Sequence, residues 1–99
     1  MSQDRLEALQ SMLQQDPQNA FLGYAYGQEL MQRGRLAEAI AAFRSVLQRD
    51  PNYAAACFHG GQAAEKSGDV DGARAFYEQG IEITRRTGDQ KTRAELEAA

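Results

Sequence analysis

The sequence predicts an all-α protein, a short α-solenoid of antiparallel helix pairs with about six helices in a single domain over residues 1–99. Three observations predict it. One internal offset relates most of the chain to itself, apolar residues recur every three or four positions, and glycines interrupt this pattern at matching places. No segment shows the alternation of apolar and polar residues that is typical of a strand.

The internal repeat has a period of 34 residues, the separation of Asp16-Pro17 from Asp50-Pro51. The same offset relates glycines, alanines and aromatic residues further along the chain, and it extends back to the N-terminal leucines. The matched pairs include Gly27 and Gly61, Gly34 and Gly68, Ala39 and Ala73, Phe43 and Tyr77, and Leu6 and Ile40. A period of this length indicates stacked supersecondary units, each packed against its neighbours.

Each repeat unit is expected to be a pair of helices. Between Leu36 and Leu47 the apolar side chains fall on one helical face, and the other segments follow the same spacing. Gly34 and Gly68 are expected to end helices in the left-handed conformation, and Pro51 prevents a helix from continuing. The predicted helices span residues 3–15, 19–33, 36–49, 53–67, 70–87 and 90–98.

Composition and charge exclude several classes of function. The net charge is −3, so no overall positive field attracts nucleic acid or anionic lipid. The longest apolar run, residues 54–58, is far shorter than the roughly 20 residues of a membrane span. The first residues lack a secretory signal, and one cysteine fits a reducing compartment. We therefore expect a cytoplasmic protein with neither nucleic-acid nor membrane partners.

No metal or cofactor site is expected. Cys57 and His59 lie two residues apart, so on a helix they project about 200° apart, and the chain has no other cysteine or histidine. Cys57 is interpreted as a small buried hydrophobic residue. Gly60-Gly61 follows no predicted strand and precedes no GKS or GKT, so it is not a phosphate loop.

The repeat resembles the tetratricopeptide repeat family. A small residue, an aromatic residue four positions later and a closing proline are kept as Ala39, Phe43 and Pro51, and then as Ala73 and Tyr77. The resemblance implies a right-handed solenoid. It covers full repeats at 20–53 and 54–87, a capping half-repeat at 3–19 and a C-terminal capping helix at 88–99. The first helix of each repeat keeps the family's motif weakly, and Arg85 replaces the second proline, so that helix is expected to continue to about Thr87.

The resemblance also implies a non-catalytic adaptor that binds a partly apolar peptide or helix of another protein. In the family, the first helix of each pair lines a concave groove. Family members that hold a C-terminal carboxylate use lysine, arginine and asparagine there, whereas this chain has Tyr24, Gln28 and His59, so a carboxylate clamp is disfavoured. The expected groove residues are Phe21, Tyr24, Gln28, Met31, Phe58, His59, Gln62 and Glu65.

Three alternatives remain open at this point. Phe21 and Tyr24 could pack on the N-terminal cap, and Phe58 between the repeats, because apolar stripes at helical spacing usually belong to a core. His59 could be a groove residue or an incidental surface histidine. Self-association into a homodimer, through the groove or a solenoid end, is the alternative function.

Catalysis is not expected, because only His59 and Glu65 are ionisable on the predicted groove and no nucleophile has a plausible base. The largest departure from the family pattern is Gly60, where leucine is usual and where a mid-helix glycine costs roughly 1 kcal/mol. We expect Tyr26, with Phe76 or Tyr77, to fill the space beside it. Gly60→Leu would then overpack the site, and Gly60→Ala would be nearly neutral.

Overall fold

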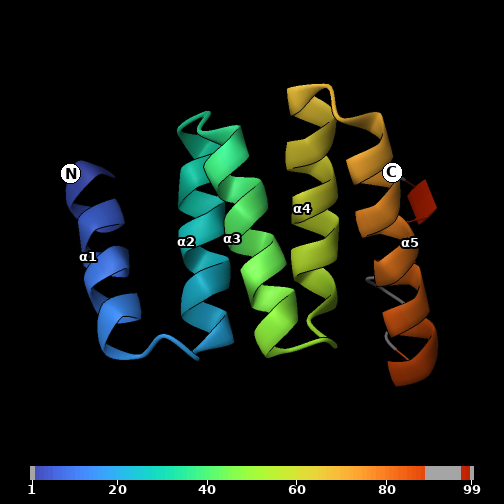
Figure 1. Cartoon of the computed structure of the whole chain (residues 1–99), viewed down its shortest axis with the longest axis horizontal. Helices are drawn as coiled ribbons and strands as arrows, with labels where there is room; N and C mark the ends of the chain where they lie inside the picture. Colours follow the sequence, from blue (N-terminus) through green and yellow to red (C-terminus); the bar gives the residue numbers. More distant parts are fainter. Residues whose placement is uncertain (1, 89–96, 99) are drawn as a thin grey trace.

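The computed structural model describes residues 2–88 and 97–98, with side chains from residue 5 onward. Five helices form a single row with α1 at one end and α5 at the other (Figure 1). No strand occurs within these ranges. The helices are α1 (Ser2–Gln15), α2 (Ala20–Gln32), α3 (Leu36–Arg49), α4 (Ala54–Ser67) and α5 (Val70–Thr87).

The first five predicted helices are confirmed, with ends that agree to within one residue. Gly34 and Gly68 have φ angles of 74° and 86°, the left-handed conformation predicted for them. Helix α5 continues to Thr87, as the absence of a second closing proline predicted. The predicted helix 90–98 lies almost entirely outside the described residues, so it stays a prediction together with the repeat boundaries.

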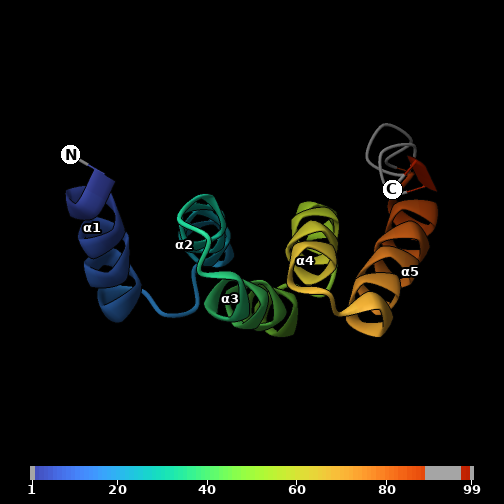
Figure 2. The ribbon, with the colours of Figure 1, turned by 90° about the horizontal axis from the view of Figure 1, so that it is seen from above.

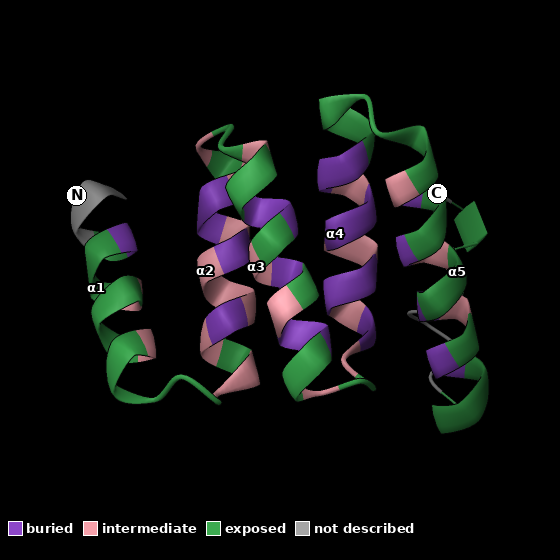
Figure 3. Ribbon diagram, viewed as in Figure 1, coloured by how far each residue is buried: buried purple, intermediate pink, exposed green. Residues whose placement is uncertain are grey.

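The helices stack as a solenoid in which each helix packs on the next one along the chain. Helices α2 and α4 also contact each other and lie on the same side of α3, as Figure 2 shows. The buried residues concentrate on α2, α3 and α4, whereas most of α1 is exposed (Figure 3). This distribution is expected when the inner helices have neighbours on both sides and α1 packs on α2 alone.

Aromatic rings packed directly on helix glycines hold each helix pair together. The ring of Phe43, from α3, covers Gly27 of α2 so closely that an added Cβ would lie 2.7 Å from its Cε1. Phe76 covers Gly60 in the same way, with 2.6 Å between its Cε1 and a Cβ added at Gly60. Tyr77 covers Gly61. A real Cβ atom does not approach a ring carbon so closely, so only glycine allows this helix spacing.

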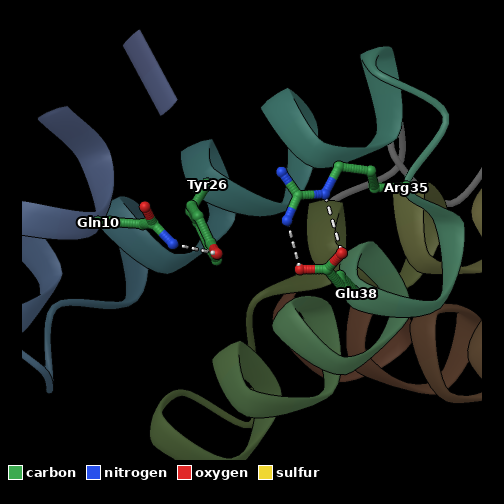
Figure 4. Close-up of polar contacts among 4 residues, drawn as sticks. All are labelled: Gln10, Tyr26, Arg35 and Glu38. Atoms are coloured by element: carbon green, nitrogen blue, oxygen red, sulfur yellow. Dashed lines mark hydrogen bonds and ion pairs between the residues drawn. The ribbon is translucent and has the colours of Figure 1, made fainter. Parts of the chain in front are cut away.

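The two repeats fill one equivalent place in opposite ways. The first repeat has a large residue on its first helix and a small one on its second, Tyr26 and Ala42; the second repeat has Gly60 and Phe76. Phe76 therefore fills the space beside Gly60, as expected, but Tyr26 does not share that role. Its hydroxyl oxygen accepts a hydrogen bond from the amide of Gln10 in α1, at 3.2 Å (Figure 4).

A buried carboxylate links α1 to α2. Glu29 is only 5% exposed and forms ion pairs of 3.1 Å with Arg5 of α1 and with Arg33, one turn further along α2. Leu6, 2% exposed, supplies apolar contact beside them. A buried charge must be paired, so Glu29 makes the position of α1 depend on specific partners.

The ring-on-glycine packing predicts that the effect of Gly60→Ala changes sign with its neighbour. In the native protein, Gly60→Ala should destabilise by about 1–3 kcal/mol and not be nearly neutral as expected from the sequence, because the methyl group meets the Phe76 ring. In a Phe76→Ala background the ring is absent, and Gly60→Ala should stabilise by up to about 1 kcal/mol through helix propensity. Urea unfolding of the four proteins measures both effects. A stabilising Gly60→Ala in the native background would contradict this packing.

The buried ion pairs predict unequal effects for their members. Glu29→Gln should destabilise by about 1–3 kcal/mol, because the largely buried Arg33 side chain then loses the Glu29 carboxylate. Arg5→Gln should cost less than about 1 kcal/mol, because its side chain is 71% exposed. Thermal unfolding of both variants tests this order, and an equal or larger loss for Arg5→Gln would refute it.

Candidate functional site

Helices α2 and α4 form a hollow of about 210 Å³, called the α2/α4 hollow below. It brings together four of the eight predicted groove residues, Gln28, Met31, His59 and Gln62. Sequence reasoning missed two other members, which lie four residues after the two glutamines and hence on the same helix face. The complete lining is Gln28, Met31, Gln32, His59, Gln62 and Lys66.

A cluster of rings supports His59 at the edge of this hollow. Its ring lies 5.5 Å from the Tyr24 centroid, 5.2 Å from that of Phe58, and is stacked on Phe43 at 6.3 Å. Tyr53 packs on Tyr24 from the other side, at 5.2 Å. Aromatic pairs at these separations have defined geometry, so neighbouring rings hold the His59 ring in place, and its role in binding stays a prediction.

Tyr24 and Phe58 therefore belong to a packed ring cluster, and neither of them lines the α2/α4 hollow. Tyr24 contacts rings from α3 and α4, and its packing on the N-terminal cap stays a hypothesis. Its hydroxyl oxygen accepts a hydrogen bond of 3.1 Å from the Gln28 amide, which orients that glutamine within the hollow. Phe58 and His59 are adjacent on α4, so their edge contact lies within one helix, and the packing of Phe58 between the repeats stays a hypothesis.

Phe21 and Glu65, like Tyr24 and Phe58, do not line the α2/α4 hollow. Phe21 is 64% exposed. Glu65 accepts a hydrogen bond from the Tyr77 hydroxyl and lines a different hollow, with Val70 and Ile81 of α5. Burial, and to a lesser extent the Glu65 carboxylate, raise the pKa of Tyr77, so its hydroxyl stays a hydrogen-bond donor well above the pH at which a free tyrosine ionises.

The lining of the α2/α4 hollow suits the recognition of polar backbone groups. Side-chain amides offer both donors and an acceptor, so Gln28, Gln32 and Gln62 can pair with the peptide groups of a bound segment. Met31 adds an adaptable apolar contact. Lys66 is the cation of this lining, which contains no carboxylate.

The fold defines a helical repeat protein, and comparison with known proteins identifies its family. Residues 30–92 match the model of the tetratricopeptide repeat. A TPR repeat-containing protein of Pseudomonas aeruginosa is 30% identical over 92% of this chain and 87% of its own length. The chain belongs to the tetratricopeptide repeat family.

Solved structures agree with this assignment. A tetratricopeptide repeat domain protein from Salinibacter ruber is 34% identical, with a TM-score of 0.74 over 81% of this chain and 89% of its own. PcrH, solved in complex with the chaperone binding region of PopD, shares the fold with a TM-score of 0.91 at 18% identity, over 98% and 74% of the two chains. YrrB, described as a TPR protein with an unusual peptide-binding site, has a TM-score of 0.85 at 20% identity. The match covers 99% of this chain and 49% of YrrB.

The burial of Cys57 predicts an unreactive thiol. Its side chain is fully buried beneath the ring cluster, and burial raises its pKa to about 12. Because the thiolate is the reactive form, the native protein should react with a disulfide reagent at pH 8 roughly a thousandfold more slowly than the unfolded chain does. Absorbance of the released thiol dye, with and without guanidinium, measures both rates. Rates within about tenfold of each other would place Cys57 at the surface.

Proposed function

We propose that this chain is a non-catalytic adaptor that binds an extended segment of a partner protein in the α2/α4 hollow. The observation that carries the proposal is the convergence of three glutamines, Lys66 and a ring-supported His59 on one hollow. Extended segments expose backbone donors and acceptors, which side-chain amides recognise independently of sequence. Apolar side chains of the segment would contact Met31 and the exposed ring of Phe21.

The proposal agrees with what is known of proteins that share the fold. PcrH was solved with a region of its partner PopD, and YrrB is described as having a peptide-binding site. No helix in the described ranges is long and apolar enough to cross a membrane. A cytoplasmic location stays a prediction.

Self-association through a solenoid end is a second candidate, favoured by exposed apolar residues. Met12 of α1 occupies the repeat position of Val46, which is fully buried and lies over Gly23 of α2. Met12 itself is 49% exposed, because no described helix precedes α1. Val70, at the start of α5, is 66% exposed. A second copy that covered these residues would bury apolar surface.

The adaptor proposal predicts that two amides control peptide binding. Peptides selected from a random library on the immobilised protein should bind the double variant Gln28→Ala, Gln62→Ala about tenfold more weakly, because each lost hydrogen bond contributes about 0.5–1.5 kcal/mol. Fluorescence anisotropy of a labelled selected peptide gives both affinities. Gln14→Ala with Gln15→Ala, two exposed glutamines of α1, is the matched control and should bind like the native protein.

Two outcomes would contradict the adaptor proposal. One is a library from which no peptide is enriched over the bare support. The other is a dimer, by light scattering, that persists on dilution and dissociates in Met12→Gln, which would favour the self-association module. Selected peptides whose affinity does not change in the glutamine double variant would place the binding site elsewhere on the protein.

A further inference from the structure

A second hollow, of about 350 Å³, lies between α3 and α5 and shares no lining residue with the α2/α4 hollow. It is called the α3/α5 hollow. Two of the four α5 residues at this place are small, Gly72 and Ala75, which leaves space beside the larger Phe76 and Gln79. Leu47 and Phe76, both almost fully buried, form an apolar floor. The complete lining is Arg44, Leu47, Gln48, Gly72, Ala75, Phe76 and Gln79.

The polar side chains of this hollow have unused hydrogen-bonding capacity. The Arg44 guanidinium lies over the Phe76 ring, with its Cζ 5.5 Å from the ring centroid. Among the described residues no carboxylate pairs with Arg44, and no hydrogen bond engages the side chains of Gln48 or Gln79. The Arg44 cation, which contacts the Phe76 ring but no described carboxylate, and two amides without described hydrogen bonds therefore lie beside one apolar floor.

The equivalent place in the first repeat shows that this arrangement is not a general property of the fold. There, α2 and α3, with Leu13 of α1, line a hollow of about 320 Å³. Glu38 stands at the repeat position of Gly72, and its carboxylate is paired with Arg35 at 2.8 Å (Figure 4). Ala42 stands at the position of Phe76. Only the second repeat replaces the carboxylate by glycine and supplies a ring beneath an arginine.

We propose that the α3/α5 hollow is a second protein-binding site, which takes a large apolar side chain next to an aspartate or glutamate of a partner. The apolar side chain would rest on Leu47 and Phe76, and the carboxylate would pair with Arg44. The net charge of −3 disfavours acidic partners elsewhere on the surface, so the local positive charge supplies specificity. Because the two hollows share no residue, the site can be occupied while a segment is bound between α2 and α4.

Two blocked dipeptides test the proposal, acetyl-aspartyl-leucine amide and its asparaginyl analogue. They are titrated into the isotope-labelled full chain, and amide chemical shifts report where each one binds. The shifts should cluster at Leu47, Gly72, Ala75 and Gln79. The aspartyl peptide should bind about two- to fivefold more tightly, the factor expected of one exposed ion pair. In Arg44→Gln this advantage should disappear.

Two further variants separate the site from nonspecific attraction. Ala75→Leu fills the hollow from an exposed position, so it should abolish the shifts while the spectrum of the folded chain is retained. Arg74→Gln removes a neighbouring exposed arginine that does not line this hollow, and it should preserve the aspartyl preference. Shifts centred on His59 and Gln62, equal affinity for both peptides, unchanged binding to Ala75→Leu, or no binding at all would each overturn the proposal.

Discussion

The close contact between aromatic rings and helix glycines is the constraint on which the rest of this structure depends. Phe43 on Gly27 and Phe76 on Gly60 set how near the two helices of each pair approach. The same Phe43 ring stacks on His59, so the contact that joins α2 to α3 also supports a residue of the α2/α4 hollow. Packing within a repeat and the geometry of the candidate site are therefore coupled through one side chain.

The two repeats share a backbone plan but differ in their surfaces. Exchanging the large and small partners, from Tyr26 and Ala42 to Gly60 and Phe76, leaves the helix pairing intact because the total volume is similar. The exchange changes which side chains lie between the second helix of one pair and the second helix of the next. The first repeat directs its ring toward α1, where it accepts a hydrogen bond, whereas the second places its ring beneath Arg44. Two hollows of similar size thus differ in their charged side chains, because the first contains Glu38 and Arg49 and the second contains Arg44 without a carboxylate.

The ends of the solenoid follow from the same repeat logic. A residue that is buried in the middle of the row, such as Val46, becomes exposed at the equivalent place in α1, because a described neighbour is lacking there. The protein compensates partly with polar contacts. The buried Glu29 pairs with Arg5, and Gln10 donates to Tyr26, so α1 is positioned by charge and hydrogen bonding as well as by Leu6. Such contacts specify orientation more than they add stability.

The sequence by itself determined the helices, their order and their pairing, because periodicity, glycines and Pro51 act over one or two turns. It also predicted four of the six residues that line the α2/α4 hollow, since repeat register places Gln28 and Gln62 on equivalent faces. Only the tertiary structure decided which neighbour each face meets. Glu65 turns to Tyr77 and leaves the predicted groove, and Lys66 joins it. These outcomes depend on side chains from helices that are distant in sequence. Ring-on-glycine packing sets how closely these helices approach, and helical periodicity alone does not predict it.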